Sequence, residues 1–106
     1  MATLEGEAGS LFRWIESWYL SQCDGKWEHS HGIQIASLDN PGWSVAIDLK
    51  DTRLRHAPME TVNKNVSDSD WVRCEVVDGK FLGRGDPLKL SYVLKVFQGW
   101  VEGAPN

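Results

Sequence analysis

The sequence predicts an α+β fold in which an antiparallel sheet meander of about five strands is flanked in the chain by an N-terminal and a C-terminal helix. Apolar residues at helical spacing occur near the two ends of the chain, and alternating strand patterns separated by turn signals fill the middle. The length of 106 residues suits a single domain. Each helix carries one apolar stripe, so both helices are expected to pack on one face of the sheet.

The first helix is expected to follow a flexible, acidic segment at residues 1–9, with Ser10 as its N-cap. It should end near Ser21, because Asp24 and Gly25 form a turn signal. One face of this helix would be apolar and would pack on the sheet. That face consists of Leu11, Trp14, Ile15, Trp18 and Tyr19.

A hairpin is expected next, with a first strand around Ile33 and Ile35 and a second strand over residues 43–49. Residues 40–42 have the order Asn-Pro-Gly, which suits a type II turn. A four-residue loop would turn the side chain of Ile35 away from that of Val45. We therefore expect a five-residue loop or a bulge that places Ile35 opposite Val45.

The later strands follow a polar connection. Residues 58–66 form a weak strand pattern that suits the edge of a sheet. Residues 71–77 form a further strand, and Asp-Gly at 78–79 is typical of a two-residue type I′ hairpin turn. That turn would pair Val76 with Phe81 and place both side chains on one face.

The second helix is expected to begin with Asp86 as N-cap and Pro87 at its first position. It should end just before Gly103, so a single domain would cover residues 10–102 and residues 103–106 would form a flexible tail. Its apolar stripe consists of Leu90, Val93, Leu94, Phe97, Trp100 and Val101.

Composition excludes several classes of function. The net charge of −4 and the pI near 5.2 argue against a protein that binds nucleic acid by neutralising phosphates. No apolar run approaches the ~20 residues of a membrane span, and residues 1–10 lack the basic start of a secretory signal. Cys23 and Cys74 lie far apart in the sequence, which favours free thiols in a reducing cytoplasm. We therefore expect a cytoplasmic protein without nucleic-acid or membrane partners.

Cys23, His29 and His31 form the densest group of candidate metal ligands or nucleophiles. Structural zinc sites use four ligands at characteristic spacings, which are missing here, and the two histidines fit the exposed start of a strand. Cys23 follows a predicted helix, whose negative end disfavours a reactive thiolate. We predict no catalytic residue, metal or cofactor. A small cysteine-dependent enzyme using Cys23 and His29 is the alternative.

Six tryptophans are the unusual feature of the composition, and three of them lie on the predicted helix stripes, where they suit the core. The other three, Trp27, Trp43 and Trp71, start predicted strands beside turns. There they either pack locally or anchor a protein interface. A further alternative is a module for binding a small ligand or a second copy. It would use the sheet face away from the helices, with Trp71, Val77 and Leu82.

Several runs resemble the immunity protein 53 family over residues 11–101. The Trp-Glu-His and Asp-Asn-Pro-Gly-Trp runs together carry most of this resemblance. The runs are Trp18-Tyr19, Gln22-Cys23-Asp24-Gly25-Lys26-Trp27-Glu28-His29, Leu38-Asp39-Asn40-Pro41-Gly42-Trp43, Ile47-Asp48-Leu49, Asp70-Trp71, Asp78-Gly79-Lys80-Phe81 and Phe97-Gln98-Gly99-Trp100.

The resemblance implies a non-enzymatic antitoxin of a bacterial polymorphic toxin system, which binds a cognate toxin domain and blocks its active site. If the toxin is a nuclease, its cleft would be basic, and an acidic inhibitor would associate with it quickly. The acidic and aromatic loop residues Asp24, Trp27, Glu28, Asp39 and Trp43 are the expected interface. The competing interpretation is that Trp27 and Trp43 pack the first hairpin against the helices.

Overall fold

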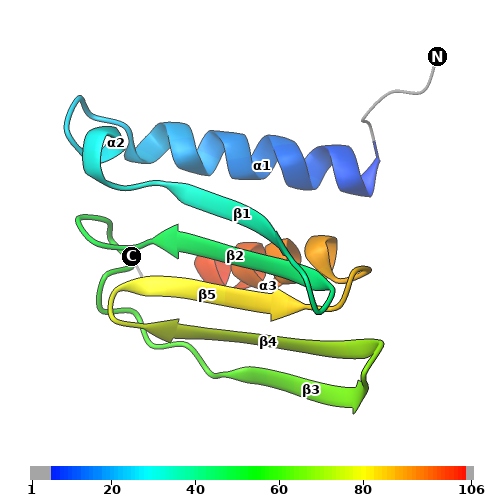
Figure 1. Ribbon diagram of the computed structural model, residues 1–106. Helices are drawn as coiled ribbons and strands as arrows, with labels where there is room; N and C mark the ends of the chain where they lie inside the picture. Colours follow the sequence, from blue (N-terminus) through cyan, green and yellow to red (C-terminus); the bar gives the residue numbers. More distant parts are fainter. Residues whose placement is uncertain (1–5, 105–106) are drawn as a thin grey trace.

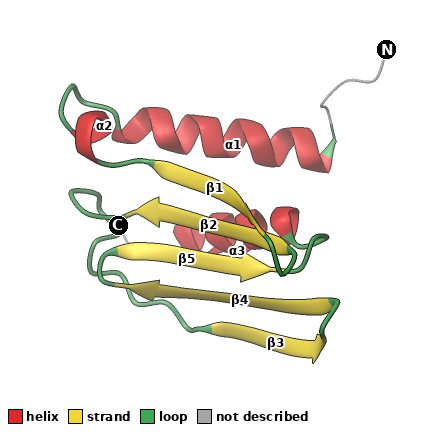
Figure 2. Ribbon diagram, in the orientation of Figure 1, coloured by secondary structure: helices red, strands yellow, loops and turns green. Residues whose placement is uncertain are grey.

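The computed structural model describes residues 6–104 and confirms the α+β class, with a five-stranded antiparallel sheet between an N-terminal and a C-terminal helix (Figure 1, Figure 2). Parts of the two segments expected to be flexible, residues 1–5 and 105–106, lie outside the described residues. The elements are α1 (Glu7–Gln22), α2 (Trp27–Ser30), β1 (Ile33–Leu38), β2 (Gly42–Asp48), β3 (Val62–Ser67), β4 (Asp70–Val77), β5 (Lys80–Gly85) and α3 (Leu90–Gly103).

The strands lie in the order β1-β2-β5-β4-β3, so the sheet is a hairpin joined to a three-stranded meander and not one continuous meander. The connection at residues 49–61 leads from β2 past the positions of β5 and β4 to β3, at the other edge of the sheet. This order puts buried side chains in the centre, because β2, β4 and β5 each contain buried residues while every residue of β3 is at least partly exposed. The sheet therefore has exposed edges around a buried middle.

The first hairpin has the predicted register but not the predicted loop. Ile35 lies opposite Val45, as expected. The connection contains only residues 39–41, and its Asn-Pro peptide bond is cis, so the expected five-residue loop or bulge was wrong. Gly42 is the first residue of β2 and not the third residue of a type II turn. A Cβ atom at Gly42 would lie 2.3 Å from the carbonyl oxygen of Gly85, so only glycine permits this approach of β2 to the end of β5.

The second hairpin is as predicted. Asp78 and Gly79 both have positive φ, at 53° and 76°, as a type I′ turn requires. Val76 lies opposite Phe81. The edge strand β3 begins at Val62, four residues later than expected, and its pairing with β4 is interrupted near Val66.

Both long helices begin away from the predicted positions. α1 starts at Glu7 with Gly6 as N-cap, so the prediction of Ser10 as cap was wrong, whereas its end at Gln22 agrees with the turn signal. α3 starts at Leu90, several residues after the expected cap Asp86. The reason is that Asp86 is used in a turn that ties the end of β5 to β4.

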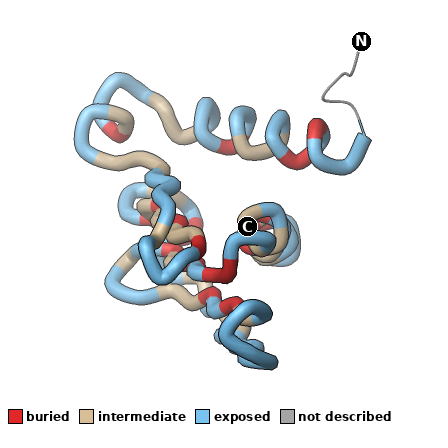
Figure 3. Tube along the Cα trace, turned by 45° about the vertical axis from the view of Figure 1, so that its right-hand side comes forward, coloured by how far each residue is buried: buried red, intermediate tan, exposed pale blue. Residues whose placement is uncertain are grey.

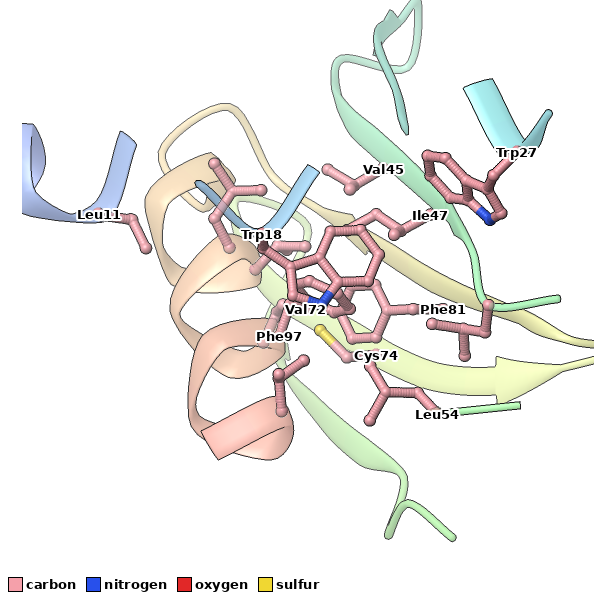
Figure 4. Close-up of a cluster of buried hydrophobic side chains, with 14 residues drawn as sticks. Leu11, Trp18, Trp27, Val45, Ile47, Leu54, Val72, Cys74, Phe81 and Phe97 are labelled. Atoms are coloured by element: carbon pink, nitrogen blue, oxygen red, sulfur yellow. The ribbon is translucent and has the colours of Figure 1, made fainter. Parts of the chain in front are cut away.

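The core forms where the two helices meet the sheet. α3 lies on one face of the sheet and α1 lies alongside β1 in contact with α3 (Figure 1, Figure 3). Phe97 of α3 occupies the centre (Figure 4), with its ring centroid 5.0 Å from those of both Trp18 and Phe81. Gly83 lets α3 approach, because a Cβ there would lie 2.3 Å from Val93. None of the helices in residues 6–104 is long and apolar enough to cross a membrane.

A buried carboxylate fixes the junction of β4, β5 and α3. Asp86 is fully buried, and its carboxylate accepts hydrogen bonds from the backbone N–H of Trp71 and of Leu88, each at 2.9 Å. The ammonium group of Lys89 lies 2.8 Å from Asp86 and also 2.8 Å from Asp70. The Lys89 hydrogen bond, followed by the two backbone donors, lowers the pKa of Asp86 to about 2.

This geometry predicts an acid-dependent loss of stability. Because the pKa of Asp86 lies below its ordinary value of 3.8, its contribution is complete above that pH and disappears as the pH falls towards about 2. Asp86→Asn should therefore lower the urea midpoint at neutral pH and approach the wild-type midpoint near pH 2. A difference between variant and wild type that is equally large at both pH values would contradict this assignment.

Candidate functional site

The five residues expected to form an interface lie at two ends of the molecule. Asp24, Trp27 and Glu28 lie at the α1–α2 end, whereas Asp39 and Trp43 lie at the opposite end of the first hairpin (Figure 1). The six residues of β1 separate the two groups by about 20 Å. The structure therefore does not bring the five together on one small surface.

At the α1–α2 end, the acidic side chains hold their own loop. The carboxylate of Asp24 accepts hydrogen bonds from the backbone N–H of Lys26 and of Trp27, each at 2.9 Å. The carboxylate of Glu28 accepts hydrogen bonds from the backbone N–H of Asp24 at 3.0 Å and of Gly25 at 2.8 Å. Backbone donors lower the pKa of both acids, that of Asp24 mainly through Trp27. These carboxylates act as internal caps of the turn.

Trp27 is part of the core. Its side chain is 3% exposed, and its indole N–H donates a hydrogen bond to the carbonyl of Lys50 at 2.9 Å. Its ring meets those of Trp18 and Tyr19 edge-on, at centroid distances of 6.2 and 5.9 Å. Trp27 begins the short helix α2, so the expectation of a strand start here was wrong. The turn before it explains why a helix can begin here. The backbone N–H groups of residues 24–27 already donate to the carboxylates of Asp24 and Glu28.

The candidate thiol chemistry has no supporting geometry in residues 6–104. The thiol of Cys23 donates to the carbonyl of Tyr19 at 3.3 Å, and no hydrogen bond joins it to His29. His31 lies near Asp51, at 3.5 Å. Burial raises the pKa of the second thiol, Cys74, to about 11. No group of three or more His, Cys, Asp or Glu side chains in this part of the chain is placed to hold a metal ion.

Three turns gather at the other end of the sheet, at residues 39–41, 68–69 and 86–88 (Figure 1). We call them, together with Val66, the strand-end surface. Asp39 and Asp68 are exposed there, and Leu88 and Val66 are large apolar side chains with exposed fractions of 88% and 76%. The surface thus combines apolar tips with carboxylates.

Trp43 holds one turn of the strand-end surface in place. The side chain is half-buried, and its indole N–H donates a hydrogen bond to the carbonyl of Pro87 at 2.9 Å. This bond fastens the turn before α3 to the start of β2. Trp43 therefore positions an exposed turn, whereas the competing interpretation had this residue packing the first hairpin against the helices.

A hollow adjoins the strand-end surface on the sheet face that the helices leave open. Its volume is about 490 Å³, and its lining includes Leu38, Trp71, Arg73 and Arg84. Sequence reasoning placed Trp71 and Arg73 on one face but did not name Arg73 or Arg84 as a candidate site residue. The signal was available, because the turn at 78–79 that pairs Val76 with Phe81 also pairs Arg73 with Arg84.

A family model described as immunity protein 53 matches residues 12–102. No curated protein and no solved structure matches the chain significantly.

The packing of Trp27 predicts a loss of stability on truncation. Trp27→Ala removes a buried ring and its hydrogen bond to Lys50, so the free energy of unfolding should fall by about 3–5 kcal/mol. Leu20→Ala is the control, because Leu20 lies on α1 with an exposed fraction of 71% and should change stability by less than about 0.5 kcal/mol. Urea unfolding followed by tryptophan fluorescence measures both. Equal effects of the two substitutions would show that Trp27 does not belong to the core.

Proposed function

The chain belongs to the immunity protein 53 family, and we propose that it neutralises its toxin by covering the toxin with the strand-end surface. Immunity proteins of this kind bind a cognate toxin and are generally not enzymes. The observation that supports this surface is the combination of Leu88 and Val66, both strongly exposed, with the exposed carboxylates of Asp39 and Asp68 in two of the turns at the same end of the sheet. Apolar anchors with a charged rim are the usual anatomy of protein interfaces.

The strand-end surface also suits rapid and specific binding. Its turns are held in place by the buried carboxylate of Asp86 and by the hydrogen bond of Trp43 to Pro87. A surface that is already ordered has less conformational entropy to lose on association. Its carboxylates would attract a basic toxin, such as a nuclease with a phosphate-binding cleft, and would speed the encounter.

We assign different roles to the five residues that the sequence singled out. Asp39 would contact the toxin, and Trp43 would support the turn that contacts it. Asp24, Trp27 and Glu28 would stabilise the fold, because their polar groups bind the backbone of the molecule itself.

We place this activity in the cytoplasm of the producing cell. Both thiols of the described residues are free, which is compatible with a reducing compartment. A cysteine-dependent enzyme is the weaker candidate, because the thiol of Cys23 is bound to the carbonyl of Tyr19.

The test of neutralisation is co-expression with the toxin candidate encoded beside this gene. Cells that make the toxin domain should stop growing, and cells that also make this chain should grow. The purified pair should form a complex. Growth arrest in the presence of the well-folded chain, together with no complex, would overturn the proposal.

The proposed surface predicts a charge effect on association. The double variant Asp39→Lys, Asp68→Lys should slow binding to a basic toxin about tenfold or more at low salt, because two attractive charges become repulsive. Glu16→Lys, Glu60→Lys makes the same change in net charge at exposed sites elsewhere and is the control. Stopped-flow or surface plasmon resonance at several salt concentrations measures the rates. Equal slowing by both double variants would indicate net charge alone and would exclude this surface.

A further inference from the structure

One row of side chains crosses the open face of the sheet. Direct pairing places Ser44 of β2 opposite Arg84 of β5, Arg84 opposite Arg73 of β4, and Arg73 opposite Asn63 of β3. These four residues contribute to the hollow beside the strand-end surface, and the helices pack on the other face. The row therefore forms the polar floor of the hollow.

Two arginines face each other in this row, and both act on Glu75, whose pKa is lowered mainly by its hydrogen bond with Arg73 and to a smaller extent by the charge of Arg84. Arg73 donates to both oxygens of Glu75, at 2.9 and 3.2 Å. Arg84 has no hydrogen bond or ion pair with any residue in the described part of the chain. Like charges directly opposite on neighbouring strands repel each other. The sheet thus carries two arginines beside one carboxylate, and that carboxylate makes its hydrogen bonds with Arg73 and none with Arg84.

The lining of the hollow is basic although the chain as a whole is acidic. Arg73 and Arg84 are the charged side chains of the lining, and no carboxylate contributes to it, whereas the ammonium of the lining residue Lys64 donates to Tyr92 of α3. Trp71 forms one wall, with its ring 3.5 Å from the position that a Cβ atom at Gly42 would take. Arginine and tryptophan are the residue types enriched at the energetic centres of protein interfaces.

We propose that the hollow receives a carboxylate side chain from an extended acidic segment of the toxin, with Arg84 as its main partner. This inference rests on the proposed function. The guanidinium of Arg84 offers paired donors that match the two oxygens of a carboxylate. Asn63 and Asn65 of β3 also line the hollow, and their amides would bind the backbone of the segment.

The position of the hollow favours a protein segment as its occupant. Its floor is the pleated sheet, which gives a recess that spans several strands. It also continues directly into the strand-end surface, because Leu38 and Asn40, which flank Asp39, belong to its lining. A toxin seated on the turns would therefore reach the hollow without a gap in the interface.

The first experiment tests the chemistry of the hollow without the toxin. The isotope-labelled full chain is titrated with a capped oligoglutamate peptide and followed by NMR. The indole N–H of Trp71 and the Nε–H of Arg84 should shift and saturate. Arg84→Gln should weaken binding about tenfold, while its melting temperature stays close to that of the wild type, because Arg84 is exposed and makes no hydrogen bond within residues 6–104. Arg13→Gln, on the exposed side of α1, should bind like wild type.

Three results of this titration would overturn the proposal. They are no saturable shifts at Trp71 and Arg84, equal weakening by Arg84→Gln and Arg13→Gln, or a response to inorganic phosphate but not to the peptide.

The second experiment uses the toxin and separates this inference from the proposed function. Arg84→Glu should weaken the complex at least tenfold more than Arg13→Glu, which makes the same change in net charge. Equal affinities of the two variants would overturn the assignment of the hollow while leaving neutralisation intact. If the wild-type chain does not bind the toxin at all, the proposed function fails. In that case the inference about a toxin segment fails as well, even if the peptide binds in the hollow.

Discussion

Asp86 is the one charged residue of the described chain that is completely buried, and the arrangement of one whole end of the molecule depends on it. Its carboxylate accepts hydrogen bonds from the backbone at the start of β4 and from the turn before α3, and it lies against the ammonium of Lys89. A buried ion pair gains little over a well-packed apolar pair of similar volume, because the loss of hydration offsets much of the attraction, although removal of one partner alone is costly. The buried carboxylate of Asp86 instead fixes the local geometry, because each donor has to reach one of its two oxygen atoms. The carboxylate therefore holds the turn at 86–88 against the start of β4, at the strand-end surface.

The aromatic core determines which surface is available for binding. The ring of Phe97 meets Trp14, Trp18, Phe81 and Trp100, so the large apolar side chains of both helices converge on one side of the sheet. With both helices committed to that side, the other face stays open to solvent. An open antiparallel face normally carries polar side chains, as this one does. The open face and the strand-end turns adjoin, which gives one continuous surface that the helices do not cover.

Features of the fold that depend on residues close together in the sequence could be predicted. Features that depend on pairing between distant residues could not. The turn at 78–79 and the register of Ile35 follow from residues within one hairpin. The start of α3 does not, since Asp86 is bound to Trp71, which lies fifteen positions earlier in the chain. The strand order likewise depends on where residues 49–61 carry the chain. The expected interface likewise combined residues from the two ends of β1. Residues that share a pattern of acidic and aromatic side chains in the sequence can still be separated by the full length of a strand.

The charge of this chain has to be considered at two length scales. Exposed charges in physiological salt are screened beyond about 8 Å, so a net charge of −4 describes the approach of a partner and not its final contacts. In the final contacts, the local set of side chains decides which groups fit. Here an acidic rim, with Asp39 and Asp68, lies beside a basic recess centred on Arg84. A partner that satisfies both needs a basic surface interrupted by an acidic segment, and a uniformly basic protein would leave Arg84 without a counter-charge. The alternation of charge across these adjoining surfaces is thus a source of specificity that the overall acidity of the chain conceals.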